Sequence, residues 1–377
     1  MPKLLLVANV SKEHIRKFHI PFILHMKELG WQVDVACRLD EPVPECDHAF
    51  DLPCDRNPLR GGLTESIRVL RRIVRENGYD VVHCNTVTGA IVARLACAPL
   101  RKQGVKVFYT CHGMHFFKGA PASRWIVGWP MEKLLAPMTD LLITINGEDR
   151  DMAHKHLGAC GAIEKIDGIG VNLDKYRWGV MTAEERAAFR RSLGLGPDDF
   201  VITYVAELIA NKNQQALLQM LDLIRDEIPQ AKLMLVGPDH EDGKLLRQAE
   251  QMGLSDRVLC LGWRSDVPKL LGCSDLYTAS SRSEGLGLNI IEAMCSGLPV
   301  AALRNRGHCE LIDHGRNGFL ADQDDIRGLA DSVLTLYRDE ALRQRITRQA
   351  QQDVCRYDTA HVLEQLAAIY EKHGAQA

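Results

Sequence analysis

The residues best placed for chemistry lie in a polar, glycine-containing loop, 280–287, that follows an apolar run. We expect a helix to begin near Gly287 and to end before Gly297 and Pro299, because glycine commonly ends a helix and proline cannot continue it. Gly285 and Gly287 let the backbone approach a ligand, since no Cβ intervenes. The free N–H groups and the positive dipole end of a helix start suit a diphosphate.

Two glutamates flank this helix start. Glu284 precedes the helix and Glu292 falls in its second turn. Helical side chains lean toward the N-terminus, so Glu292 can point back at the loop. Neither carboxylate would bind phosphate, but each can accept hydrogen bonds from sugar or ribose hydroxyls. The alternative is a core helix with two solvated glutamates, and the strand–loop–helix context favours a nucleotide-sugar site over it.

The elements that position this segment alternate between short apolar runs and helical patterns. In the first half the expected strands are 3–8, 32–37, 80–84, 105–110 and 141–145, and the expected helices are 18–29, 63–76, 88–100, 125–136 and 148–157. Near-continuous β-branched and leucine runs separated by helices indicate parallel strands that are covered on both faces. This half of the chain is therefore predicted to be a doubly wound α/β unit.

The same rhythm restarts after a stretch rich in glycine and charge. In the second half the expected strands are 200–205, 232–236, 258–261, 276–278 and 300–302, and the expected helices are 183–193, 214–225, 244–252, 288–295, 326–337, 340–353 and 359–373. A chain of 377 residues suits two such domains. We place them at 1–176, joined by the C-terminal helix 359–377, and at 177–358. Ligands of open α/β sheets bind at the carboxyl ends of the strands, which predicts a cleft between the domains.

Motifs along the whole chain resemble those of a known family. They are EGLGLNIIEAMCSGLPV at 284–300, HIP at 19–21, DVVHCNT at 80–86, TCHG at 110–113, KN at 212–213, and ELI at 310–312 before NGF at 317–319. Their order is similar to that of retaining family-four glycosyltransferases of the GT-B fold. The segment 111–149 is especially similar to enzymes of bacterial exopolysaccharide and capsule biosynthesis. The resemblance implies an acceptor-binding first domain and a second domain that binds the nucleotide-sugar.

The resemblance also implies roles for single residues. Glu284 would hold hydroxyls of the donor sugar, and Glu292 would hold the ribose. Lys212 would contact the diphosphate and steady the departing nucleotide, whereas an ordinary solvated lysine is the alternative. His112, at a strand end, would contact the donor sugar, although a lone histidine is more often structural. The backbone of three residues would hold the diphosphate: Gly287, Leu288 and Asn289.

Glu207 departs from the family pattern, because many relatives carry an arginine there that also clamps the diphosphate. At ~8 Å and an effective dielectric near 20 each unit charge contributes about 2 kcal/mol, so the exchange would cost on the order of 4 kcal/mol. Three arrangements avoid this cost. Glu207 turns away, or it pairs with Lys212 and orients it, or another base such as Arg282 supplies the missing charge.

The composition argues against a nucleic-acid-binding, disulfide-rich, metal-binding or membrane-spanning protein. The formal net charge of −3 gives no reason to expect a nucleic acid partner. Twelve cysteines include no Cys-x-x-Cys pair, so we expect reduced thiols in the cytoplasm. No His, Asp or Glu grouping has metal-ligand spacing along the sequence, so we expect neither a metal nor a cofactor. No run approaches the ~20 apolar residues of a membrane span.

A basic helix face and an aromatic segment suggest contact with a membrane surface. The face comprises Arg68, Arg71, Arg72 and Arg75, and the segment is 116–131. Both could dock to anionic headgroups and a lipid-linked acceptor, which would place the protein on the inner face of the plasma membrane. A solvated basic helix and a buried aromatic helix are an equal alternative.

The residues and the resemblance predict one reaction. It is transfer of a sugar, with retention at the anomeric carbon, from a nucleotide-sugar to a glycan or polyprenyl-diphosphate-linked acceptor in cell-surface polysaccharide biosynthesis. The resemblance makes UDP the preferred nucleotide. Two alternatives remain, a nucleotide-sugar epimerase of the same architecture and a catalytically silent scaffold of a polysaccharide-synthesis complex.

Overall fold

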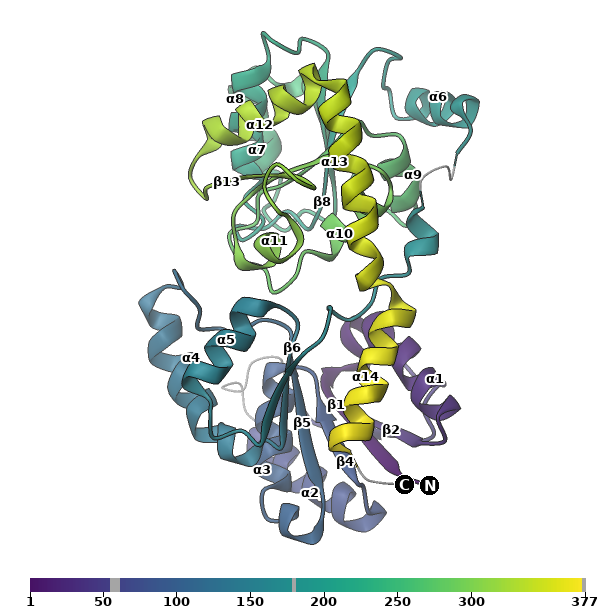
Figure 1. Ribbon diagram of the computed structural model, residues 1–377, viewed down its shortest axis with the longest axis vertical. Coiled ribbons are helices and arrows are strands. Elements are labelled where there is room, and N and C mark those ends of the chain that lie inside the picture. The colour runs from purple at the N-terminus through teal and green to yellow at the C-terminus, as the bar shows by residue number, and fades with distance from the viewer. Residues whose placement is uncertain (55–61, 178–180, 375–377) are drawn as a thin grey trace. The chain divides into compact units, whose positions relative to one another are not determined.

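The structure, a computed structural model, describes residues 1–54, 62–177 and 181–374. The chain divides into two compact units (Figure 1). Unit 1 comprises Met1–Gly170 and Thr359–Ala377, and unit 2 comprises Val171–Asp358. Each is an α/β domain built on a fully parallel sheet.

Unit 1 contains a seven-stranded sheet with the order β3-β2-β1-β4-β5-β6-β7. The strands are β1 (Lys3–Val10), β2 (Gln32–Arg38), β3 (Ala49–Asp51), β4 (Val81–Cys84), β5 (Lys106–Cys111), β6 (Leu141–Thr144) and β7 (Ala162–Lys165). The chain runs outward from β1 through β2 to β3 and then returns to β4 on the other side of β1. The strand order therefore reverses between β1 and β4, the position at which open parallel sheets bind ligands.

Helices cover both faces of this sheet (Figure 1). They are the π-helix η1 (Ser11–His19) and the α-helices α1 (Ile20–Glu28), α2 (Leu63–Asn77), α3 (Val87–Cys97), α4 (Ala122–Leu135), α5 (Gly147–His156) and α14 (Thr359–His373). Successive strand residues point to opposite faces. Accordingly Val82 packs with Leu70 of α2 in one core cluster, whereas its neighbour His83 contacts Phe22 of α1 and Tyr370 of α14.

The C-terminal helix is an integral part of unit 1. Tyr370 is 2% exposed and makes ring contacts with Phe22, Trp31 and Phe108. The Lys106 ammonium donates to the carbonyls of His373 and Gly374, each at 2.8 Å. These bonds satisfy carbonyl groups that the end of a helix leaves unpaired.

Unit 2 contains a six-stranded sheet with the order β10-β9-β8-β11-β12-β13. The strands are β8 (Phe200–Val205), β9 (Ala231–Val236), β10 (Val258–Cys260), β11 (Leu276–Ala279), β12 (Val300–Leu303) and β13 (Phe319–Ala321). The helices are α6 (Ala183–Ser192), α7 (Gln214–Ile224), α8 (Lys244–Gln251), α9 (Val267–Gly272), α10 (Leu288–Cys295), α11 (Arg306–Leu311), α12 (Ile326–Arg338) and α13 (Glu340–Asp353). Here the order reverses between β8 and β11.

The doubly wound α/β class and nearly all expected elements are confirmed. The sequence analysis missed most of the π-helix η1, because the expected helix began only at residue 18. It also missed five short elements: β3, β7, β13, α9 and α11. Each has three to six residues, which is too short for a hydrophobic period to show. The predicted domain boundary was 176/177. In the structure the 3₁₀ helix η5 (Leu173–Tyr176) packs against α10 and so belongs to unit 2.

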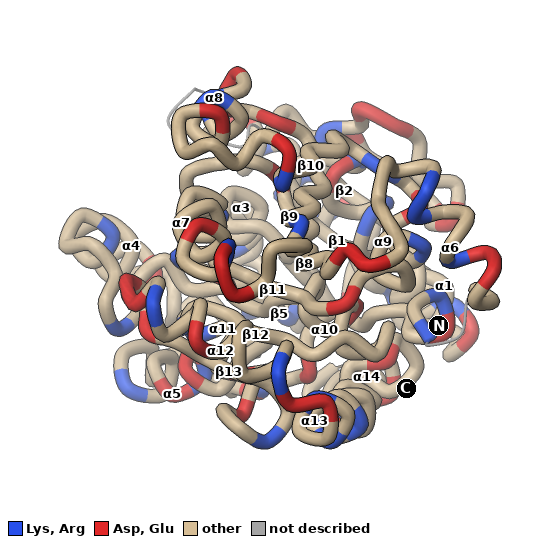
Figure 2. Tube along the Cα trace, turned by 90° about the horizontal axis from the view of Figure 1, so that it is seen from above, with Lys and Arg blue, Asp and Glu red and all other residues tan. Residues whose placement is uncertain are grey.

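Charged residues of both signs are mixed along the chain, and the cysteines, all within the described residues, form no disulfides. Figure 2 shows Lys and Arg interspersed with Asp and Glu. All twelve cysteines are free thiols, and only Cys309 and Cys355 are exposed. Among the helices in the described part of the chain, none has the length and hydropathy needed to cross a bilayer.

Each unit contains a buried histidine that should make its stability depend on pH. Burial lowers the pKa of His83 to about 3 and that of His308 to about 4, from an ordinary value of 6.5. Between pH 6.5 and these values the unfolded chain binds protons that the native chain does not, so stability falls as the pH falls.

We therefore expect the free energy of unfolding to decrease by about 1.4 kcal/mol per pH unit for each such histidine between pH 6.5 and 5. Urea denaturation at pH 7 and pH 5 measures this change. His83→Gln should flatten the dependence, whereas His154→Gln, at an exposed position on α5, should not. A wild-type stability that is equal at the two pH values would contradict the assignment.

Candidate functional site

Two loops meet at the point where the strand order of unit 2 reverses. One follows β8 and carries Lys212, and the other follows β11 and carries Glu284. Three hydrogen bonds join them. Arg282 N donates to Asn211 O (2.8 Å), Asn211 Nδ2 donates to Ser283 O (3.0 Å), and Ser280 Oγ donates to Lys212 O (2.8 Å). These hydrogen bonds hold the two loops in a fixed position relative to each other.

Lys212 and Glu284 form an ion pair at this junction. Lys212 Nζ lies 2.5 Å from Glu284 Oε1, and the side chains are 22% and 18% exposed. Partial burial weakens solvent screening, so this pair is stronger than a surface ion pair. The structure thus brings together two of the three residues predicted to be catalytic.

The backbone of Glu284 is held in place by α11. Arg306 Nε donates to Glu284 O at 3.1 Å. A Cβ on Gly307 would lie 2.8 Å from the Cβ of Glu284, a separation that real Cβ atoms essentially never show. The next residue, His308, is buried, and its Nδ1 lies 2.6 Å from Leu303 O. Sequence reasoning missed these supporting residues, and the only local signal was Asn305, which caps α11.

The start of α10 presents backbone N–H groups, as expected for an anion site. Gly287 is its N-cap and has no side chain that could cap the helix. Asn289 Oδ1 accepts a hydrogen bond from Ile290 N at 3.0 Å, within the first turn. The side chain of Asn289 is held by β8, because its Nδ2 donates to Val205 O at 2.9 Å. A Cβ on Gly287 would lie 3.2 Å from the Ile290 side chain, which leaves little room for any larger residue. Leu288 and Asn289 are half-buried in the first turn.

Glu292 lies one turn further along α10 and is half-buried. Its carboxylate accepts a hydrogen bond from the Tyr176 hydroxyl. Burial and the negative charge of Glu292 raise the pKa of Tyr176 above its ordinary value. The tyrosine orients the carboxylate and uses only part of its capacity to accept hydrogen bonds.

Glu207 does not pair with Lys212, whose partner is Glu284. Its side chain is exposed, and among the described residues no ion pair includes it. Gln214 Nε2 donates to the Glu207 carbonyl at 2.8 Å, which fixes the backbone only. Of the three arrangements considered above, the structure favours the one in which Glu207 turns away.

Arg282 is 57% exposed, and its guanidinium lies 3.9 Å from Asp324. It lines a 190 Å³ pocket together with residues of 208–215 and of α8. Contact between Arg282 and a diphosphate stays a prediction.

His112 directly follows β5 in unit 1 and is half-buried. Burial lowers its pKa to about 4, so the imidazole is neutral near pH 7. In the described part of the chain its Nε2 is buried and makes no hydrogen bond. In His83, on β4, both ring nitrogens have partners: Nδ1 lies 2.7 Å from the Tyr370 hydroxyl and Nε2 lies 2.7 Å from Thr110 Oγ1. His83 is therefore structural, and His112 retains a nitrogen for a ligand.

The prediction of a membrane-contacting surface is corrected in part. Arg71 donates to the carbonyls of Leu95 (2.9 Å) and Ala96 (3.0 Å) and so satisfies the end of α3 instead of facing outward. Arg68 pairs with Glu65 on its own helix. In the segment 116–131 three of the four aromatic residues, Phe116, Trp125 and Trp129, pack in the core cluster. The basic face thus offers fewer free cations than the sequence suggested.

Comparison with known proteins agrees with this geometry. Residues 22–167 match the family model Glycosyltransferase Family 4, and residues 185–353 match Glycosyl transferases group 1. EpsD of Bacillus subtilis strain 168, a protein named as a glycosyltransferase, is 36% identical over 373 residues, which are 99% of this chain and 97% of EpsD. The chain therefore belongs to glycosyltransferase family 4 and is related to exopolysaccharide enzymes.

Further relatives and solved structures agree. The UDP-Gal:alpha-D-GlcNAc-diphosphoundecaprenol alpha-1,3-galactosyltransferase of Escherichia coli is 29% identical over 289 residues, 74% of this chain and 71% of its own. The crystal structure of Anabaena Alr3699/HepE in complex with UDP and glucose matches with a TM-score of 0.80 and 23% identity, over 99% of this chain and all of that one. The fold is GT-B, with two Rossmann-like domains. The protein is a glycosyltransferase.

The Lys212–Glu284 pair yields a prediction about catalysis. Lys212→Ala should lower kcat by about 10²–10³-fold, the effect of removing one donor that stabilises a developing anion. Glu284→Gln should chiefly raise KM for the donor. Both are measured by steady-state transfer kinetics. Lys269→Ala, an exposed lysine on α9, is the matched control. Wild-type kcat in the Lys212 variant would show that this lysine does not stabilise the leaving group.

Proposed function

We propose that this protein is a retaining, metal-independent glycosyltransferase that moves a sugar from a UDP-sugar to a glycan or lipid-linked acceptor in cell-surface polysaccharide biosynthesis. The observation that carries the proposal is the Lys212–Glu284 ion pair beside the start of α10, whose N-cap residue is Gly287. A cation, a sugar-binding carboxylate and free backbone N–H groups occupy one end of one sheet. This combination suits a sugar diphosphate better than any other ligand class.

In this proposal each group has one task. The backbone N–H groups of Gly287, Leu288 and Asn289 and the ammonium of Lys212 stabilise the negative charge that grows on the leaving diphosphate. Glu284 holds hydroxyls of the donor sugar, and Glu292, oriented by Tyr176, holds the ribose. Because the helix start and the lysine neutralise the diphosphate, the reaction needs no metal ion for that purpose.

His112 is proposed to contact the donor sugar through its unpartnered Nε2. A neutral imidazole nitrogen can donate to or accept from a hydroxyl, depending on its tautomer. No carboxylate of the site is arranged as a nucleophile, since Glu284 is paired with Lys212 and Glu292 with Tyr176. We therefore propose attack by the acceptor on the face from which the nucleotide leaves, with the leaving diphosphate accepting the acceptor proton.

The choice of UDP and of a lipid-linked acceptor is supported by the relatives. The Escherichia coli galactosyltransferase is named for a UDP-sugar donor and a diphosphoundecaprenol acceptor, and HepE was crystallised with UDP-glucose. A nucleotide-sugar epimerase is not favoured, because the family models and the reported relatives are glycosyltransferases. The ion pair and open helix start also argue against a silent scaffold, which would need neither.

The outer face of α4 is the part of unit 1 that we assign to the apolar portion of the acceptor. Ile126, Val127 and Leu134 are 72%, 67% and 71% exposed, an unusual cluster on one helix. A 510 Å³ pocket beside the helix is lined by Val127 and Met131, among others. A polyprenyl chain on this face would hold the enzyme at the inner surface of the plasma membrane.

The nucleotide assignment is tested by thermal unfolding in the presence of UDP-, GDP- and ADP-sugars. A ligand at 100 times its Kd adds ~2.7 kcal/mol of stability, so UDP-sugars should raise Tm and the others should not. Glu292→Ala should weaken UDP binding about tenfold, and Tyr176→Phe should weaken it less. Glu250→Ala, an exposed glutamate on α8, should bind as the wild type does. A larger shift with GDP-sugars than with UDP-sugars would refute UDP as the donor nucleotide.

The acceptor assignment is tested on α4. Ile126→Gln combined with Val127→Gln should raise KM for a polyprenyl-diphosphate-linked acceptor at least tenfold, because burial of an aliphatic side chain contributes about 1.5–3 kcal/mol. KM for a short-chain acceptor analogue should stay unchanged. The control is Leu223→Gln, at an exposed position of unit 2. Equal KM values of the double variant and the wild type for the long-chain acceptor would remove α4 from the acceptor site.

A further inference from the structure

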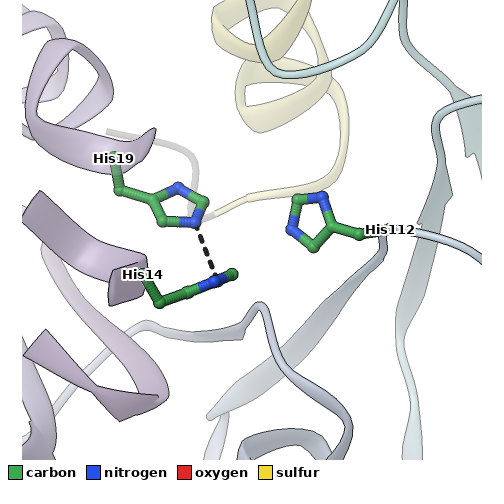
Figure 3. Close-up of side chains that lie close together, drawn as sticks. All are labelled: His14, His19 and His112. Carbon is green, nitrogen blue, oxygen red and sulfur yellow. Dashed lines mark hydrogen bonds between the residues drawn. The ribbon is translucent and has the colours of Figure 1, made fainter. Parts of the chain in front are cut away.

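Three histidines converge at the carboxyl end of the unit 1 sheet (Figure 3). His14 and His19 come from η1, directly after β1, and His112 comes from the end of β5. One ligand nitrogen from each of the three rings lies within 4.8 Å of the others. His14 and His112 are half-buried and His19 is 6% exposed, so the group is screened from bulk solvent but reachable.

The π-helical form of η1 makes this convergence possible. In an α-helix two residues five apart lie about 140° apart around the axis and cannot share a ligand. The wider π-helix bonds residue i to i+5 and stacks their side chains on one face, and such turns are frequent at functional sites. His14 and His19 are five apart, and their Nε2 atoms lie 3.1 Å from each other.

The ring arrangement approximates that around a tetrahedral ion. Three imidazoles bound to one Zn²⁺ through nitrogens at about 2.0–2.1 Å would have nitrogens about 3.3 Å apart and ring centroids about 5 Å apart. The observed centroid separations are 4.8 Å for His14–His19, 5.6 Å for His14–His112 and 6.0 Å for His19–His112, with interplanar angles of 51°, 78° and 61°. A shift of roughly 1.5 Å or less by His112 would complete the triad.

The hydrogen bonding of the rings also suits a metal ion. Within the described residues the buried Nε2 of His112 has no hydrogen-bond partner, unlike both nitrogens of the nearby His83. The Nε2 atom of His112 is therefore available as a metal ligand, near the adjacent Nε2 atoms of His14 and His19.

We propose that His14, His19 and His112 form a binding site for one borderline-soft divalent cation, Zn²⁺ in particular, with water as the fourth ligand. All-imidazole sites select Zn²⁺, Cu²⁺, Ni²⁺ or Co²⁺ over Mg²⁺ and Ca²⁺, which prefer oxygen ligands. An open fourth position is a feature of zinc sites with three protein ligands.

Occupancy of the site inhibits sugar transfer, a consequence that rests on the proposed function. His112 cannot ligate the cation and contact the donor sugar through the same nitrogen. A bound cation therefore lowers the rate of sugar transfer. Such inhibition is consistent with the proposed function, in which Lys212 and the start of α10, and not a metal ion, neutralise the diphosphate.

Binding is tested without any nucleotide-sugar. Titration of the purified chain with Co²⁺ should give visible d–d bands typical of tetrahedral coordination at one equivalent, without a thiolate charge-transfer band. Competition with a chromophoric chelator gives the Zn²⁺ affinity. His14→Gln should weaken it at least tenfold, in line with the loss of one of three ligands. His154→Gln, an exposed histidine of the same unit, should leave it unchanged.

Circular dichroism confirms that each variant is folded. Electron paramagnetic resonance of the Cu²⁺-loaded wild type provides a second measurement that needs no variant, because coupling to three imidazole nitrogens identifies the ligand set. Wild-type Zn²⁺ affinity in His14→Gln, or fewer than three coupled nitrogens, would overturn the site.

Inhibition is measured separately, as the Zn²⁺ concentration that halves transfer. It should rise at least tenfold in His14→Gln, and a chelator should restore wild-type activity. Zn²⁺ binding at the triad without inhibition would overturn the inhibitory role. Because binding is measured without substrate, failure of the glycosyltransferase proposal would not affect the test of the cation site.

Discussion

Reversal of strand order in each parallel sheet is the constraint on which both candidate sites depend. At such a point the chain leaves adjacent strands in opposite directions, so the loops at their carboxyl ends diverge and leave backbone and side chains open to a ligand. In unit 2 this position brings Lys212 beside Glu284, 72 residues away along the chain. In unit 1 the π-helix η1, with His14 and His19, follows β1 at the reversal, and His112 follows β5, the second strand from β1.

Charge at the unit 2 site is balanced before any ligand arrives. Lys212 is neutralised by Glu284, and the N-cap residue of α10, Gly287, has no side chain. Leaving a partly buried charge unpaired is costly, so the ammonium needs a counterion at every stage. A diphosphate can replace the carboxylate as that counterion, which frees Glu284 to accept hydrogen bonds from a sugar. Glu207 is exposed and takes no part in this ion pair.

In unit 1 hydrogen bonding distinguishes two histidines, His83 and His112. His83 engages both nitrogens with Tyr370 and Thr110 and so fastens α14 to the sheet. His112, two strands from β1 in the same sheet, keeps one nitrogen unbonded within the described structure. Both have lowered pKa values caused by burial, so the difference lies in hydrogen bonding and not in titration.

The sequence by itself determined the α/β class, the position of most strands and helices, and the loop that precedes α10. These are local properties: hydrophobic periodicity, glycine at a turn and proline after a helix act over a few residues. Tertiary structure alone decided that Lys212 pairs with Glu284 and not with Glu207, and that Arg71 serves the end of α3. It also decided that His14 and His19 share a face, because a π-helical turn leaves no period in the sequence. Partners such as these depend on strand order and helix packing, which join residues that the sequence keeps far apart.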